Sequence, residues 1–171
     1  MKATFWRSVI LVSVAGLAAF WAWALFFASK QAVNKIDDRA WAERAERICA
    51  TAQAQRDELA DERRLDPDDP AMLAERAGIV DEATAIVETM LDDVVAVPPD
   101  DGKGRAIVPQ WEADYRTYLE NRREFTALLR SGENEPFRET AVDGIPISEK
   151  LEQFASDNEM PSCAPPRDLA N

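Results

Sequence analysis

An uncharged run of 22 residues, positions 8–29, constrains this 171-residue chain more than any other feature. As an α-helix the run is roughly 33 Å long, enough to cross a hydrocarbon core of about 30 Å. Arg7 and Lys30 bracket it, and it exceeds the apolar core of about 7–15 residues of a cleaved signal peptide. We therefore expect a single uncleaved transmembrane helix over 8–29, with cleavage near Ala22-Trp23-Ala24 as the alternative.

Tryptophan and alanine residues suggest how this helix contacts lipid headgroups and a second transmembrane helix. Indole rings prefer the headgroup zone of a bilayer. The predicted membrane-interface anchors are Trp6, Trp21, Trp23 and Trp41. Ala15 and Ala19, four residues apart, form a possible face for packing against another transmembrane helix. The lipid bilayer is thus the first expected partner.

The two cysteines and the length of the chain after the span decide its orientation, against the count of basic residues. Lys2 and Arg7 precede the span and four basic residues follow it closely, which by charge alone favours the reverse orientation. Long domains, however, translocate largely regardless of charge, and a very short head before one anchor is usual for an exported protein. We place a head of residues 1–7 in the cytoplasm and residues 30–171 outside the cell membrane.

Charge and composition exclude several classes of function. The formal charge is −12, and because Lys2 and Arg7 precede the span, the other 18 basic and all 32 acidic residues follow it, giving −14 there. Such a surface repels phosphates, so we expect no nucleic-acid partner. The chain has no histidine, which excludes Ser-His-Asp catalysis and imidazole metal sites.

Two helical patterns follow the span. The first continues from the membrane helix and stops near Arg64, before Pro67. The second opens at Asp68-Asp69-Pro70, where acidic residues and proline suit a helix N-terminus. Apolar residues recur at alternating spacings of four and three in both, typical of a core-facing stripe. The first stripe is Trp41, Ala45, Ile48, Ala52, Gln55 and Leu59; the second is Leu73, Ala77, Val80, Thr84, Val87, Leu91 and Val94.

Two further helices complete the prediction, after an exposed loop over residues 97–104. One begins near Pro109 and ends at Gly132, a residue type common at helix C-termini. Its stripe is Trp111, Tyr115, Tyr118, Arg122, Phe125 and Leu129. A shorter helix follows Gly144, with Pro146 near its start. We therefore predict an all-α fold: a transmembrane helix running continuously or nearly so into an acidic bundle of about four helices over 30–163, then a flexible tail over 164–171.

The two cysteines predict a disulfide. Cys49 lies in the first helix after the span, and Cys163 lies 114 residues later in an irregular segment. In an exported domain such a pair is most often bridged. No Cys-x-x-Cys spacing suggests redox catalysis.

The layout resembles a group of known proteins. An N-terminal anchor, an Ala/Arg/Asp/Glu-rich helical domain with an early cysteine, and Phe154-Ala155 followed by Met160-Pro161-Ser162-Cys163 are similar to the small, mostly uncharacterised envelope proteins of actinobacteria. The resemblance implies a membrane-anchored, extracytoplasmic helical domain. It carries no catalytic residues. This chain lacks the lipobox of the lipoprotein members, so the helix must supply the anchor.

Carboxylates are the only abundant reactive groups, in three clusters beside prolines and helix ends. The clusters are Asp66, Asp68 and Asp69; Asp92 and Asp93; and Asp100 and Asp101. Oxygen ligands of this kind suit divalent cations. The EF-hand spacing fails, however, because Pro70 and Ala71 occupy positions that need a ligand and a glycine. Helix capping and solvated loops explain the clusters better, and we expect no metal site and no cofactor.

The aromatic stripe of the third predicted helix allows two interpretations. Aromatic faces bind glycans and protein partners, but helical spacing favours core packing. Arg122 interrupts this stripe and either extends to the surface or pairs with an acid. Taken together, the sequence favours a non-enzymatic, membrane-anchored interaction or scaffold protein of the cell envelope, such as an accessory subunit of a membrane complex. Its expected partner is another membrane or envelope protein. The alternative is an extracytoplasmic binding module for a cation or cationic ligand.

Overall fold

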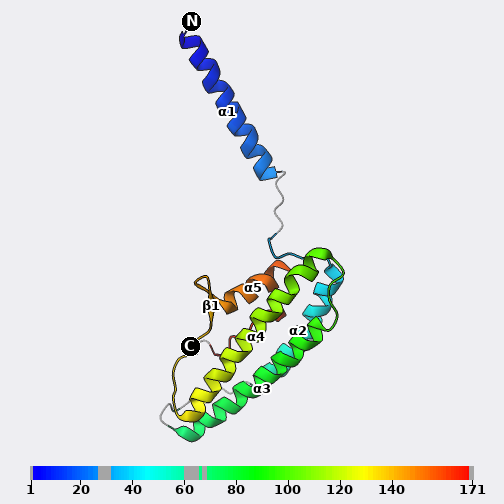
Figure 1. Cartoon of the computed structure of the whole chain (residues 1–171), viewed down its shortest axis with the longest axis vertical. Coiled ribbons are helices and arrows are strands. Elements are labelled where there is room, and N and C mark those ends of the chain that lie inside the picture. The colour runs from blue at the N-terminus through cyan, green and yellow to red at the C-terminus, as the bar shows by residue number, and fades with distance from the viewer. Residues whose placement is uncertain (1, 27–31, 60–65, 67–68, 170–171) are drawn as a thin grey trace. The chain divides into compact units, whose positions relative to one another are not determined.

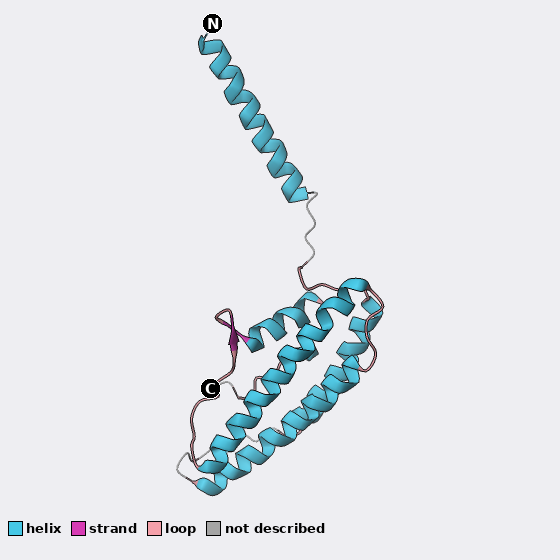
Figure 2. Cartoon of the chain, viewed as in Figure 1, coloured by secondary structure: helices cyan, strands magenta, loops and turns pink. Residues whose placement is uncertain are grey.

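The structure is a computed structural model that describes residues 2–26, 32–59, 66 and 69–169 (Figure 1). The chain divides into two units, residues 1–32 and 33–171. The described elements are helical apart from two very short strands (Figure 2). The all-α fold class is therefore confirmed.

The first unit consists of helix α1, Lys2–Phe26. Because the helix begins at Lys2, residues 2–7 of the predicted head are helical and not a separate element. In the part of the chain that the structure describes, no helix is both long and apolar enough to cross a membrane. Residues 27–29, the end of the predicted span, lie outside the described residues.

Helix α2, Arg39–Asp57, is not a continuation of α1, which corrects the prediction of a continuous helix. The described residues before it, 32–38, are non-helical. Asp38 ends that segment as the N-cap, its side chain accepting a hydrogen bond from the backbone N–H of Trp41. A carboxylate in this position satisfies a free donor of the first turn and so starts a new helix. At its other end α2 stops at Asp57, earlier than the predicted Arg64.

Helix α3, Pro70–Val95, begins as predicted, with Asp69 as its N-cap and proline in the first turn. Helix α4, Gly102–Ser131, instead begins seven residues before Pro109. Its N-cap is Asp101, and the proline lies inside the helix. Gly132 ends α4 in the left-handed conformation, with φ of 89°, so the predicted C-terminal glycine is confirmed.

Gly104 explains why α4 can begin so early. A Cβ added at this position would lie 2.7 Å from Pro99 Cγ and 2.6 Å from Asp101 Oδ2. The absence of a side chain therefore lets the loop fold back onto the first turn of α4. The two glycines of the 97–104 segment, which suggested an exposed loop, belong to the helix, and the loop is shorter than predicted.

A small hairpin precedes the last helix and was not predicted. Strands β1, Ala141–Val142, and β2, Ile145–Pro146, pair antiparallel, with Ala141 opposite Pro146. Asp143 and Gly144 between them have φ of 55° and 79°, the backbone that an Asp-Gly hairpin turn requires. Helix α5, Ile147–Asp157, follows as predicted, and the short 3₁₀ helix η1, Pro161–Cys163, comes after it.

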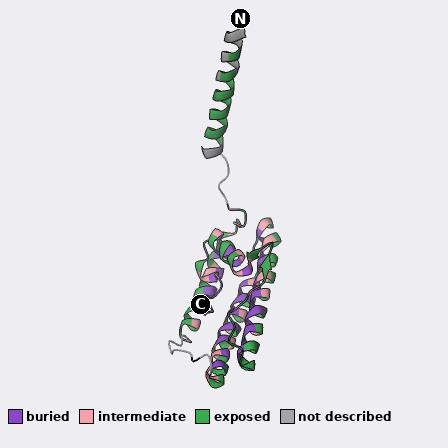
Figure 3. Ribbon diagram, turned by 90° about the vertical axis from the view of Figure 1, so that its left-hand side faces the viewer, coloured by how far each residue is buried: buried purple, intermediate pink, exposed green. Residues whose placement is uncertain are grey.

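The core of the 33–171 unit lies between α2, α3, α4 and α5. Helix α3 packs against both α2 and α4, α5 packs against α4, and η1 contacts α2 and α5. Buried residues line the inward helix faces of this unit (Figure 3). The predicted four-helix bundle is confirmed in this unit. Trp111, Tyr115, Tyr118 and Phe125 are all buried, so their stripe is core, as its spacing favoured.

Candidate functional site

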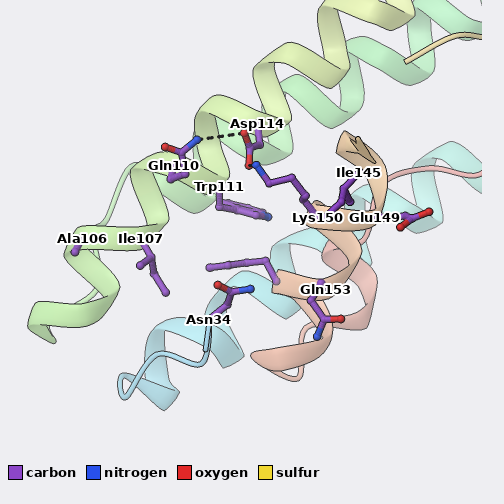
Figure 4. Close-up of a pocket in the computed structure, with 11 residues that line it drawn as sticks. Asn34, Ala106, Ile107, Gln110, Trp111, Asp114, Ile145, Glu149, Lys150 and Gln153 are labelled. Carbon is purple, nitrogen blue, oxygen red and sulfur yellow. Dashed lines mark hydrogen bonds and ion pairs between the residues drawn. The ribbon is translucent and has the colours of Figure 1, made fainter. Parts of the chain in front are cut away.

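A cleft of about 440 Å³ lies beside α4 and α5 and is the strongest candidate for a binding site (Figure 4). Its walls come from the first turns of α4, from β2 and α5, and from the segment before α2. We call it the α4–α5 cleft. Its lining residues are Asn34, Ala106, Ile107, Gln110, Trp111, Asp114, Ile145, Glu149, Lys150, Gln153 and Phe154.

Two stacked aromatic rings form the floor of the cleft. The rings of Trp111 and Phe154 lie 5.2 Å apart between centroids, at an interplanar angle of 23°. Trp41 and Tyr115 meet the indole of Trp111 edge-on. Such ring pairs add stability beyond their buried area, so the floor is rigidly held by three helices.

The indole N–H of Trp111 is an unusual feature of this floor. The side chain is 3% exposed, and its Nε1 finds no hydrogen-bond acceptor among the described residues. In Figure 4 the ring extends from α4 toward α5. A buried donor without an acceptor costs about 1–3 kcal/mol, so the floor retains an unused donor.

Polar side chains surround the floor. Asp114 accepts a hydrogen bond from Gln110 Nε2 at 3.2 Å. Its other carboxylate oxygen lies 2.9 Å from Lys150 Nζ, in an ion pair. This ion pair joins α4 to α5 at the edge of the cleft. Glu149, in the first turn of α5, is exposed and has no ion pair within the described residues.

The chemistry of this lining suits binding. The eleven described lining residues include amides, carboxylates and one ammonium group, but no serine, threonine, cysteine or histidine. They therefore supply no hydroxyl, thiol or imidazole as a nucleophile. Apolar floors ringed by a few polar groups are typical of ligand and peptide sites.

From its middle to its C-terminal end, α4 is covered by residues 163–169, which we call the C-terminal strap. Tyr115 Oη donates to the carbonyl of Cys163 at 3.2 Å, and Tyr118 Oη donates to the carbonyl of Pro166 at 2.8 Å. Burial raises the pKa of both tyrosines, so they stay protonated donors. The predicted flexible tail is therefore wrong for residues 164–169; residues 170–171 lie outside the described residues.

Arg122 holds the end of the strap. Its guanidinium is 0% exposed and donates to both carboxylate oxygens of Asp168, each at 2.7 Å. Burial alone would lower the pKa of Arg122, but the hydrogen bonds and charge of Asp168 outweigh it and raise the pKa. Burial likewise opposes ionisation of Asp168, yet Arg122 holds its pKa below the usual value. Of the two possibilities open from sequence, Arg122 thus pairs with an acid.

The predicted disulfide is confirmed. Cys49 and Cys163 are bridged, with both residues 0% exposed and their Cα atoms 5.0 Å apart. The bond attaches the start of the strap to the middle of α2. It closes a loop of 114 residues, which the chain-entropy model values at about 4–5 kcal/mol.

The predicted membrane-interface tryptophans occupy two different environments. Trp6, Trp21 and Trp23 are exposed on α1, as are Ala15 and Ala19 of the predicted packing face. The interpretation of Trp41 as an anchor is wrong. Its ring is 1% exposed, and its Nε1 donates to the carbonyl of Val97 at 2.9 Å, because the N-cap at Asp38 turns this first-turn residue into the bundle.

Two residues of the acidic clusters, Asp69 and Asp101, cap helices α3 and α4, and Asp92 pairs with Arg116; Asp68 lies outside the described residues. Asp38, which belongs to none of the clusters, caps α2. Asp38 accepts from the N–H groups of Trp41 and Asp100, and Asp101 accepts from those of Gly104 and Asp38. Two helix starts are thus joined by two carboxylates. Hydrogen bonds from Asp100 and Trp41 lower the pKa of Asp38. Burial raises the pKa of Asp101, but hydrogen bonds from backbone N–H groups lower it on balance.

Within the described residues, no group of three or more acidic or thiol side chains is placed to hold a metal ion.

Neither the cleft nor the strap was predicted as a site. The sequence placed Trp111 and Phe154 in the core but did not show that their stacked rings border an open cleft. No protein-family model, curated protein or solved structure matches this chain.

Proposed function

We propose that this chain is a non-enzymatic, membrane-anchored interaction protein of the cell envelope, which offers the α4–α5 cleft to a protein partner. The observation that carries the proposal is the cleft itself, in which exposed Ile145 and a ring of amide and charged groups lie over the rigid, largely buried Trp111–Phe154 pair. An accessory subunit of a membrane complex needs such a docking site and no catalytic group.

The anchor rests on the uncharged segment 8–29 and on the surface of α1. Apolar side chains that are more than half exposed run along this helix. They are Trp6, Ile10, Val12, Val14, Leu17, Phe20, Trp21 and Trp23. Exposed apolar surface of this extent is usually covered by lipid or protein, which supports insertion into the bilayer.

Placement of residues 33–171 outside the cell is supported by the buried Cys49–Cys163 bond, because such bonds persist in oxidising compartments. The test is thiol alkylation of intact cells before lysis, followed by gel electrophoresis with and without reductant. We expect no alkylation until the protein is reduced. Free alkylation of both thiols in the native protein would contradict the extracytoplasmic placement.

Partner binding is tested by isolating the full chain from its native membranes in mild detergent. We expect one partner protein in fixed stoichiometry. A monomer under several extraction conditions would contradict the interaction function. The cation-binding alternative predicts that calcium or magnesium raises the thermal midpoint, whereas our proposal predicts no change.

A further inference from the structure

We infer that the occupant of the α4–α5 cleft is a cationic, apolar segment located next to the membrane span of a second protein. This inference rests on the proposed function and adds the chemistry of the partner. Four observations on the cleft support it: its floor, its free amide, its charge and its place in the chain.

The floor selects an apolar side chain. The stacked Trp111 and Phe154 rings are themselves only 3% and 5% exposed. The apolar surface that a partner can cover therefore comes mainly from Ile107 and Ile145 beside them, and Ile145 is 47% exposed. Covering this surface removes apolar area from water at about 25 cal/mol per Å². A leucine, isoleucine or phenylalanine of the partner therefore suits the floor better than a sugar or a phosphate.

The rim provides hydrogen bonds to a peptide backbone. Only the backbone carbonyl of Asn34 is bonded, by Asn158 Nδ2 at 2.9 Å; the side-chain amide of Asn34 makes no hydrogen bond within the described residues. Asn158 is 1% exposed and also accepts from the N–H of Ile36, which holds this rim segment in place. A free side-chain amide on a held backbone can both donate to and accept from a peptide group.

The charge of the cleft favours a cation. Asp114 is already neutralised by Lys150, which leaves Glu149 as the unpaired charged group of the described lining. It belongs to a region that carries −14 over residues 30–171. Complementary charge speeds association and sets register, so a lysine or arginine of the occupant would meet Glu149.

The place of Asn34 in the chain favours a membrane-borne partner. Asn34 follows Ser29, the end of the uncharged segment, by five residues, a connection that reaches at most about 18 Å. If segment 8–29 spans the membrane as proposed, the length of this connection limits how far Asn34 lies from the bilayer, and we infer an occupant that leaves the same membrane. Basic residues beside apolar ones are common at such positions.

The inference is tested with the full chain in phosphatidylcholine nanodiscs and a fluorescein-labelled amphipathic peptide of leucine and lysine, using empty nanodiscs as the baseline. Ala106→Trp fills the cleft, and Ala113→Trp is its matched control on an exposed position of α4 outside the lining. Glu149→Lys reverses the cleft charge, and Glu124→Lys makes the same change on exposed α4 surface elsewhere.

We expect saturable binding that falls at least about tenfold in Ala106→Trp and Glu149→Lys, which is about 1.4 kcal/mol, and less than about twofold in the two controls. Equal loss in Glu149→Lys and Glu124→Lys, with no loss in Ala106→Trp, would show general attraction to an acidic surface and overturn the inference. Absence of saturable binding would overturn it too. Unchanged helicity and an intact disulfide in each variant exclude misfolding.

The native complex separates this inference from the proposed function. If Ala106→Trp still isolates the stoichiometric partner from native membranes, the interaction function stands and the cleft is not its site. If the wild-type chain isolates no partner but binds the peptide in the cleft, the chemistry of the site stands and the interaction function falls.

Discussion

Helix α4 has two ends that differ in what covers them. Trp111, near its beginning, forms the floor of an open cleft, whereas Tyr118 and Arg122, two to three turns later, lie under the C-terminal strap. All three residues belong to one stripe with the same spacing of four and three. Spacing thus decides that a side chain points into the bundle, but the neighbouring segment decides whether its surroundings are closed.

The strap closes its end of α4 because it provides acceptors in the right places. The carbonyls of Cys163 and Pro166 meet the two tyrosine hydroxyls, and the carboxylate of Asp168 meets Arg122. The cleft end has no such segment, and the Trp111 N–H stays unsatisfied among the described residues. The part of α4 under the C-terminal strap is therefore the more stable part of the helix, and the part that borders the cleft is the one available for binding.

The largest expected effect comes from removing the disulfide, which frees the start of the strap. Replacing Cys49 and Cys163 together by serine should lower the free energy of unfolding by about 4–5 kcal/mol, measured by urea denaturation. Amide exchange should rise more around Tyr118 and Arg122 than around Trp111. Equal exchange at both ends of α4 would contradict the distinction between them.

The next effect concerns the buried ion pair at the end of the strap. Asp168→Leu removes the carboxylate partner of the Arg122 guanidinium and leaves only the hydrogen bond from Arg122 Nε to Thr84 Oγ1. We expect a loss of about 3 kcal/mol, the low end for a buried pair, because the Asp168 side chain is 36% exposed. Thermal and urea unfolding measure it. The matched control is Glu152→Gln, which removes the exposed pair with Arg167 and should change stability by less than about 1 kcal/mol.

The same ion pair predicts a dependence on pH. Because Arg122 holds the pKa of Asp168 below its unfolded value of about 3.9, its stabilisation is present above that value and is lost as the pH falls through the folded pKa. Unfolding midpoints measured from pH 7 to strongly acidic conditions should fall less steeply in Asp168→Asn. The slope that remains belongs to groups such as Glu159, whose pKa is lowered by Lys35 and Arg39. Identical slopes in the two proteins would contradict the prediction.

The smallest stability effect is expected at the open end. Ala106→Trp and Ala113→Trp are both on exposed positions of α4, so each should change the free energy of unfolding by less than about 0.5 kcal/mol. Urea denaturation compares them. A loss of several kcal/mol in Ala106→Trp would mean that the cleft is closed in solution, which would remove the contrast with the strapped end.

Much of the fold could be predicted because it depends on local patterns. Periodic apolar residues located the helices, Pro70 and Gly132 located two of their ends, and the two cysteines predicted the bridge. Pro109 was misleading because proline usually marks the first turn of a helix, whereas here it lies inside α4. The true start depends on how Gly104 packs against Pro99. That contact forms only in the folded protein and produces no recurring pattern of residues in the sequence.

The candidate site could not be predicted for the same reason. The lining of the cleft combines residues 34, 106–114 and 145–154, which only the packing of α5 on α4 brings together. Arg122 could be recognised as an exception on an apolar stripe, but its partner lies 46 residues away in a segment rich in proline. Trp41 was misplaced because nearness in sequence to the predicted span says nothing about which way its ring points.

The Cys49–Cys163 bond also determines how the protein would carry mechanical load. A pull between residue 33 and the C-terminal end passes along the first part of α2, crosses the bond at residue 49, and leaves through residue 163. The rest of α2 and all of α3, α4 and α5 lie inside the closed loop and are bypassed. A partner that pulls on the C-terminal end would therefore load a short covalent path, while the parts of the cleft that belong to α4 and α5 carry no load; Asn34 lies on the loaded path.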